Sequence, residues 1–190
     1  MEPSVGWRMK GESDPLCGKV APVERADLPT IRNAEAGDVD ELAALWYEGW
    51  HDAHLEIVPG DLSALRTLDS FRARLVAALN NVRVTGPSGC LAGFYMLRDS
   101  ELYQFYVARA ARGTGVARVL IADAEAHLYA RGTQLAWLTC AIGNDRAARF
   151  YEKCGWHHAS TIVDTLSTPA GPYQLEVWRY EKVLGPHVAS

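Results

Sequence analysis

A glycine loop between an apolar run and an amphipathic stretch carries the clearest chemistry in this sequence. Residues 105–107 are apolar and strand-like, and Arg112, Gly113 and Gly115 follow in a loop that leads into a predicted helix. Glycine lets the backbone approach a ligand closely, and the first N–H groups of a helix point toward that ligand with the positive end of the helix dipole behind them. The arrangement predicts a binding site for a pyrophosphate.

Two common nucleotide-binding motifs fit this loop poorly. The dinucleotide fingerprint G-x-G-x-x-G needs a third glycine where this chain has Arg118, and the strands before the loop are predicted to be antiparallel. A P-loop needs a G-K-[ST] ending, which the loop lacks. Residues 112–117 instead match R-x-x-G-x-A, a pattern that on its own could also be a tight turn.

A second group of candidate residues lies downstream of the loop. The apolar run Leu138-Thr139-Cys140 leads to Asn144 and, seven residues further, to Tyr151 within A-R-F-Y-E-K-C-G-W. Asn144 could bind a ligand, cap the helix that follows, or do both. Tyr151 could face a ligand or belong to the core.

Periodicity and turn residues predict the elements that position these two groups. Asp38 followed by Glu41 is a capping-box pattern at the start of a predicted helix, residues 38–54, and a second helical region covers residues 62–79. Further helices are predicted at residues 115–130 and 144–153. Strands are predicted at residues 30–32, 82–84, 91–97, 102–107, 135–140, 159–166 and 173–180. The order β-α-α-β-β-β-α-β-α-β-β predicts an α/β (α+β) domain over residues 29–184, between a flexible extension (1–28) and a tail (185–190).

The loop and the Asn144–Tyr151 segment together resemble the GNAT superfamily of acyl-CoA N-acyltransferases, and the resemblance covers residues 30–182. It implies a central, mixed, mostly antiparallel and twisted sheet of about seven strands, flanked by about four helices. It also implies transfer of an acetyl group from acetyl-CoA to a primary amine, by direct attack in a ternary complex. The alternative is a catalytically weak CoA-binding sensor or interaction module with the same fold.

The resemblance also assigns a cofactor site residue by residue. It implies that the main chain of one strand end pairs with pantetheine, that the loop amides hold the pyrophosphate, and that Asn144 bonds the cofactor arm. Tyr151 would face the thioester sulfur and donate a proton to it. The implied cofactor-binding residues are Tyr106, Val107, Ala108, Arg112, Gly113, Thr114, Gly115, Val116, Ala117, Asn144 and Tyr151.

Such a reaction needs a neutral amine. An amine with a pKa of about 10.4 requires roughly 4.6 kcal/mol to lose its proton at pH 7, so a general base or a water chain is expected. Glu101 is the first candidate for a water-mediated base. The end of the first helix walls the acceptor pocket in this family, which makes His51, His54 and Glu56 the predicted substrate-binding residues, and histidine titrates near neutrality.

Composition and charge indicate which binding partners and which cellular compartment to expect. A net charge of -4 without a block of lysine or arginine argues against nucleic acid and an anionic membrane as partners, and mildly favours a cationic acceptor, either a small-molecule amine or a protein amine. The cysteines form no C-x-x-C pair, so no metal is predicted. The absence of a signal-like or membrane-spanning stretch predicts a cytoplasmic protein. The strand edge at residues 159–180 could pair two copies as a homodimer.

Overall fold

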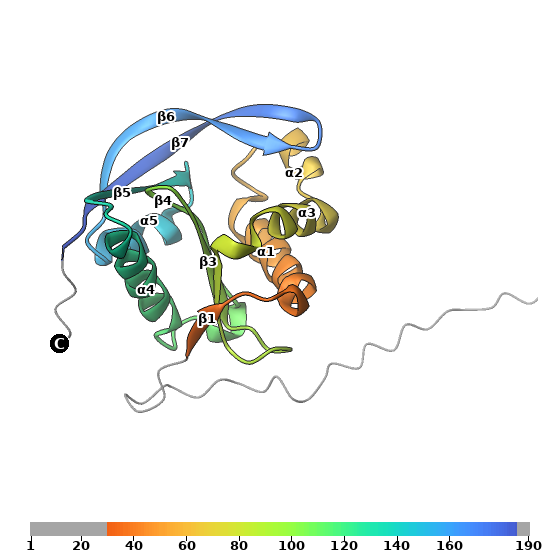
Figure 1. The fold of residues 1–190 in the computed structure, drawn as a ribbon. Coiled ribbons are helices and arrows are strands. Elements are labelled where there is room, and N and C mark those ends of the chain that lie inside the picture. The colour runs from red at the N-terminus through yellow and green to blue at the C-terminus, as the bar shows by residue number, and fades with distance from the viewer. Residues whose placement is uncertain (1–29, 186–190) are drawn as a thin grey trace, which may run out of the picture.

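The structure is a computed structural model that describes residues 30–185 (Figure 1). The extension predicted at residues 1–28 and residues 186–190 of the predicted tail lie outside the described residues. The strands are β1 (Ile31–Asn33), β2 (Val82–Thr85), β3 (Gly93–Arg98), β4 (Glu101–Val107), β5 (Leu135–Ala141), β6 (His157–Thr168) and β7 (Gly171–Val183). The α-helices are α1 (Val39–His54), α2 (Gly60–Leu65), α3 (Leu68–Ala78), α4 (Val116–Ala130) and α5 (Asp145–Lys153). Single 3₁₀ turns are η1 (Ala36–Asp38), η2 (Leu79–Asn81) and η3 (Arg109–Ala111).

The strands form one mixed sheet in the order β1-β2-β3-β4-β5-β7-β6. Every neighbouring pair is antiparallel except β4 and β5, which are parallel. The expectation of a mostly antiparallel, seven-stranded sheet is therefore confirmed.

The region predicted as one helix over residues 62–79 is two helices, α2 and α3. Arg66 leaves the helical conformation with φ -93° and ψ 63°. The Thr67 side chain then accepts a hydrogen bond from the backbone N–H of Ser70 at 3.2 Å and so begins a new helix. This break turns the side chain of Arg66 away from solvent and into the interior of the protein.

Helices cover both faces of the sheet, and each face has its own core (Figure 1). On one face, α1 and α3 pack Leu42, Trp46 and Phe71 against the sheet. On the other face, α4 contributes Leu120 and Leu128 to a second core. The long β6–β7 hairpin arches from the sheet toward α2 in Figure 1, so segments distant in sequence come near each other there.

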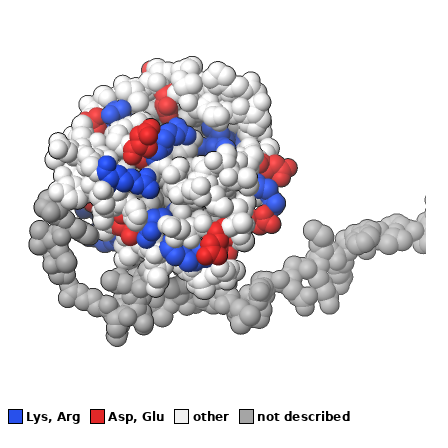
Figure 2. Space-filling view, viewed as in Figure 1, with Lys and Arg blue, Asp and Glu red and all other residues white. Residues whose placement is uncertain are grey.

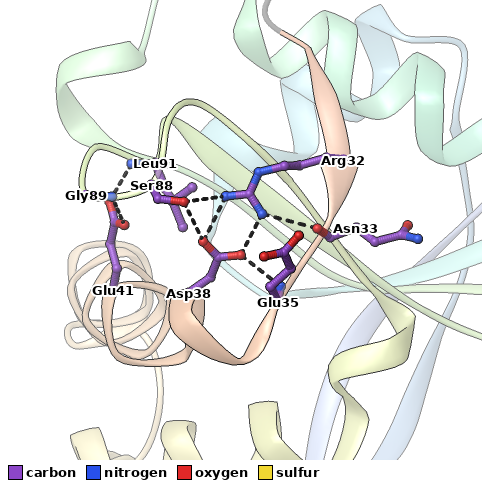
Figure 3. A network of polar contacts seen from close by, with 8 residues as sticks. All are labelled: Arg32, Asn33, Glu35, Asp38, Glu41, Ser88, Gly89 and Leu91. Atoms are coloured by element: carbon purple, nitrogen blue, oxygen red, sulfur yellow. Dashed lines mark hydrogen bonds and ion pairs between the residues drawn. The ribbon is translucent and has the colours of Figure 1, made fainter.

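A network of polar contacts fixes the start of α1, and it differs from the predicted capping box (Figure 3). Asp38 does not cap α1; its carboxylate accepts two hydrogen bonds from Arg32 of β1, at 2.6 and 2.8 Å. The Arg32 guanidinium lowers the pKa of Asp38 to about 2. Glu41 accepts hydrogen bonds from the backbone N–H groups of Gly89 and Leu91 in the β2–β3 loop. Both carboxylates therefore hold α1 against the sheet, where a capping box would have acted only within the helix.

Charge on the visible surface is mixed. Figure 2 shows Lys and Arg side chains next to Asp and Glu side chains over the face in view. None of the helices within residues 30–185 combines the length and the apolar character that crossing a membrane requires.

Candidate active site

The central feature of the site is the divergence of the two parallel strands. β4 and β5 are in register only at Glu101 and Trp137, next to a hydrogen bond of 3.2 Å from the Trp137 N–H to the Ser100 carbonyl. Beyond this point the strands separate, and both line a cavity of about 410 Å³. The carboxyl end of β4 therefore has main-chain groups that β5 does not pair.

The predicted glycine loop lies at one end of this cavity. Gly113 and Gly115 have φ of 80° and 95°, a conformation that favours glycine. The Thr114 hydroxyl donates to the Ala111 carbonyl at 2.7 Å and holds the loop in place. No side chain caps α4, and no residue within the described chain accepts a hydrogen bond from the backbone N–H groups of Gly113, Gly115, Val116 and Ala117. The loop thus fits a pyrophosphate, since it offers free donors at a helix N-terminus.

Three arginines converge on Asp52 near this loop. Asp52, near the end of α1, contacts Arg109 at 2.6 Å, Arg112 at 2.8 Å and Arg146 at 2.9 Å. The three guanidiniums hold the pKa of Asp52 well below its usual range, and Arg146 has the largest effect. One carboxylate cannot balance three cations, so the cluster retains positive charge that suits the phosphates of a cofactor.

Asn144 and Tyr151 both line the cavity. The Asn144 side-chain oxygen accepts a hydrogen bond from the Ala147 N–H at 3.2 Å, so Asn144 caps α5 while its side-chain NH₂ stays available to a ligand. Tyr151 is buried beside Phe105, and burial raises its pKa well above the usual value. Because its pKa is raised, the phenol is neutral at pH 7. Its hydroxyl has no hydrogen-bond partner among residues 30–185, and the residue lines the cavity.

Only some of the predicted residues line the cavity. Of the cofactor set, Tyr106, Val107, Arg112, Gly113, Ala117, Asn144 and Tyr151 line it, whereas Ala108, Thr114, Gly115 and Val116 do not.

Among the predicted acceptor residues, His54 lines the cavity, while His51 and Glu56 do not. Burial lowers the pKa of His54 to about 4, so the ring is neutral at pH 7. Its Nδ1 lies 2.8 Å from the Trp50 carbonyl, which can only accept. The hydrogen is therefore on Nδ1, and Nε2 has a free lone pair.

Glu101 is buried at the point where β4 and β5 meet, and it does not line the cavity. Its pKa is raised to about 7, mainly by burial; the Arg98 guanidinium opposes this rise and the Asp164 carboxylate contributes to it. Asp164 does line the cavity.

Sequence reasoning missed the residues at the end of the cavity opposite the glycine loop. This end is lined by Arg66 and Arg74 and by two residues of the β6–β7 hairpin, Leu166 and Leu175. Arginines in a helical pattern usually predict a solvated face, and only the break between α2 and α3 turns Arg66 inward. The hairpin residues gave no local signal either, because their role depends on where a distant segment folds back.

Comparisons with known proteins agree with this geometry. The model of the acetyltransferase (GNAT) family matches residues 39–156. Among curated proteins there is no significant match. Among solved structures, a GCN5-related N-acetyltransferase from Rhodopseudomonas palustris is similar, with a TM-score of 0.64 and 23% identity over 82% of this chain and 96% of that chain.

Two further solved structures have a CoA cofactor bound. The PaiA N-acetyltransferase from Thermoplasma acidophilum, in complex with coenzyme A, has a TM-score of 0.57 and 16% identity, covering 81% of this chain and 98% of that one. A phosphinothricin acetyltransferase from Sinorhizobium meliloti, in complex with acetyl-CoA, has a TM-score of 0.60 and 16% identity, covering 86% and 92%.

The diverging strands and the free amides of the loop define the fold of an acyl-CoA-dependent acetyltransferase. Because the family model matches more than half of its length, this chain belongs to the GNAT acetyltransferase family. Because these solved structures have low sequence identity to this chain, their similarity supports the fold alone. Within residues 30–185, no group of three or more His, Cys, Asp or Glu residues could hold a metal ion.

Proposed function

We propose that this protein transfers an acetyl group from acetyl-CoA to the primary amine of a small acceptor, by direct attack in a ternary complex. The observation that carries the proposal is a single cavity that joins the free amides of the glycine loop, the unpaired end of β4 and the phenol of Tyr151. The cavity is also lined by residues of α1, α2 and the β6–β7 hairpin, where an acceptor would bind beside the cofactor arm.

The chain's own groups would bind and orient both substrates. The amides of Gly113, Gly115, Val116 and Ala117 bind the pyrophosphate, and the arginines around Asp52 meet the phosphate charge. When bound, acetyl-CoA supplies an acetyl group activated as a thioester. The main chain of Tyr106 and Val107 pairs with pantetheine, and the Asn144 NH₂ donates to the same arm.

Proton handling would involve three residues. Glu101 takes a proton, through water, from the ammonium form of the acceptor. The free Nε2 of His54 accepts a hydrogen bond from the amine at the cavity wall. Tyr151, kept neutral by burial, donates a hydrogen bond to the departing sulfur. His51 and Glu56 remain predicted substrate-binding residues. Because neither lines the cavity, they could contact only a part of the acceptor that lies outside it.

The state of Cys140 favours direct transfer over an acyl-cysteine intermediate. Cys140 lines the cavity, but burial raises the pKa of its thiol to about 12. The thiolate is the nucleophilic form of cysteine, and at neutral pH almost none of it would be present.

The direct test measures CoA-thiol release from acetyl-CoA across a panel of amines. We expect steady release that depends on the amine, with the acetylated amine identified by mass spectrometry. Tight CoA binding without release by any amine in the panel would contradict the proposal and favour the sensor or interaction module with the same fold.

Replacement of Tyr151 by phenylalanine is expected to lower kcat by roughly 10- to 100-fold, since general acid assistance is lost while the ring remains. Affinity for acetyl-CoA should change little, and so should thermal stability, because the hydroxyl has no partner in the described part of the chain. Steady-state kinetics with saturating amine would measure the effect.

A matched control for this variant is Tyr180→Phe. The Tyr180 ring packs 6.2 Å from that of Tyr151, its hydroxyl bonds to Glu152, and it does not line the cavity. This control should retain its kcat. An unchanged kcat for Tyr151→Phe would remove Tyr151 from the acid role.

A further inference from the structure

The end of the cavity opposite the glycine loop contains a buried arginine with unused hydrogen-bond donors. Arg66 is 3% exposed and lines the cavity. One donor, Nη1, is bonded to the Ser167 carbonyl at 2.9 Å. Its Nε is buried without a partner, and Nη2 has none among the residues described. A buried guanidinium with unsatisfied donors is costly, so its presence calls for an acceptor outside residues 30–185.

A second arginine faces the same space. Arg74 lines the cavity and lies over the ring of Trp46, with its Cζ 4.3 Å from the ring centroid. Its Nη2 donates to the Tyr103 hydroxyl at 2.7 Å. Tyr103 and Trp46 thus orient the guanidinium, yet neither neutralises its charge.

No carboxylate within residues 30–185 forms an ion pair with Arg66 or Arg74. This distinguishes them from Arg112 and Arg146 at the other end, which share Asp52. Burial and the neighbouring Arg74 lower the pKa of Arg66 to about 10, and it is still charged at pH 7. The acceptor end therefore has two cations close together without a counter-charge.

The wall around these arginines is apolar and aromatic. It includes Trp50, Val58, Leu62, Leu166 and Leu175. Because a guanidinium fork in a desolvated site matches a carboxylate or a similar compact anion, the missing partner is such a group on an otherwise small, largely apolar molecule. The cavity of about 410 Å³ must also hold the end of the cofactor arm, which limits the size of this molecule.

We propose that the amine acceptor carries a carboxylate or another compact anionic group, bound by Arg66 and Arg74, and that it is a small amino acid or amino-acid-like amine. This inference rests on the proposed acetyl transfer and names its acceptor class. It adds an anionic group to the cationic acceptor that the net charge mildly favours. Asp164 is the one carboxylate among the described residues that line the cavity, and it is left for the ammonium end.

The first test uses the wild-type protein and needs no variant. Each apolar L-amino acid is compared with its amide and with its decarboxylated amine, which keep the amine and the side chain but lack the negative charge. We expect at least one amino acid to have a kcat/KM roughly 10- to 100-fold above both counterparts. Amides and decarboxylated amines that react as well as every amino acid would overturn the inference while leaving the acetyltransferase function intact.

The second test locates the anion site with variants. Arg66→Met and Arg74→Met should raise KM for the preferred amino acid by roughly 10- to 100-fold and leave the KM of its amide within about threefold. Arg66→Lys keeps the charge but not the fork, and should fall between wild type and Arg66→Met. The control is Arg98→Met: Arg98 is exposed, stacks on Tyr103 at 3.6 Å and does not line the cavity, so this change should leave the KM of both substrates unchanged. Arg98 lowers the pKa of Glu101, so any effect on kcat should be the same for both substrates.

Arg66 also holds the hairpin through Ser167, so a folding defect must be separable from loss of binding. Thermal unfolding of the wild type, with CoA present, is measured with and without the preferred amino acid and its amide. A rise in Tm with the amino acid alone, lost in Arg74→Met and kept in Arg98→Met, supports the inference. An equal rise with the amide, or a rise that persists in both Arg66→Lys and Arg74→Met, overturns it. Because this measurement needs no turnover, it is informative even if no amine is acetylated.

Discussion

Replacement of Glu101 by glutamine is expected to abolish the rise of kcat/KM near pH 7 and to lower the rate by roughly 100-fold. The pKa of Glu101 is raised from its ordinary value to about 7, first by burial, so the wild-type carboxylate becomes an effective base as the pH passes that value. Glutamine has the same shape and cannot accept the proton. The measurement is kcat/KM between pH 5.5 and 9 for both proteins, with an acceptor of known pKa.

The same variant should be more stable than the wild type at alkaline pH. Below pH 4.5, Glu101 is protonated in both the folded and the unfolded chain and adds no pH dependence. Between pH 4.5 and about 7, the unfolded chain loses this proton and the folded chain keeps it, so the free energy of unfolding falls as the pH rises. The loss approaches about 3 kcal/mol above pH 7. Glu101→Gln should avoid it, which denaturant unfolding at pH 5 and pH 8 can measure.

A matched control is available in the turn before β4. Asp99 is exposed, is a charge neighbour of Glu101 and has a φ of 49°, which asparagine tolerates well. Asp99→Asn should keep both the pH–rate profile and the pH dependence of stability close to wild type. If Glu101→Gln also retains the wild-type profile, Glu101 is not the base, and Asp164 and His54 become the next candidates. If the difference in stability between Glu101→Gln and the wild type is the same at pH 5 and pH 8, the pKa of Glu101 is not raised in the folded protein.

Replacement of Gly49 by alanine is expected to destabilise the protein by about 1 to 3 kcal/mol, although alanine is the better helix former. A Cβ at Gly49 would lie 2.7 Å from Cδ1 of Tyr106. That ring cannot easily move, because it stacks on Phe94 at 5.7 Å and packs near Trp46 at 6.3 Å. Equilibrium unfolding would measure the loss of stability.

The same change should weaken acetyl-CoA binding, because Tyr106 lines the cavity on the strand that would pair with pantetheine. Gly60→Ala is the control. Gly60 begins α2 and has nothing within 4 Å of an added Cβ, so alanine there should be neutral or slightly stabilising. A Gly49→Ala protein as stable as wild type, with unchanged acetyl-CoA affinity, would mean that α1 can shift away from β4 without consequence.

The positions of the glycine loop, Asn144 and Tyr151 in the fold could be predicted from the sequence because their geometry is local. Gly113 and Gly115 form a loop between β4 and α4, and the loop amides are free wherever such a helix begins without a cap. The cap formed by Asn144, and the position of Tyr151 seven residues later, depend only on α5 being helical. The parallel pairing of β4 and β5 was harder to predict. The width of the cavity between them depends on the separation of the two strands after Glu101.

The acceptor end could not be predicted in this way, because contacts between distant segments create it. Arg66 is turned inward by a break in what looked like one helix and is held by Ser167, a hundred and one residues later in the chain. Asp52 was one of several acidic residues near a helix end, and its three arginine partners come from two other parts of the chain.

The sequence by itself determined the family, the order of the strands and the position of the glycine loop between β4 and α4, since these follow from motif spacing, hydrophobic periodicity and the loop's glycines. Only the tertiary structure decided which charges share one cavity. Burial then set the ionisation of Glu101 and His54 and left Arg66 without a counter-charge, because desolvation and pairing depend on neighbours brought together by folding.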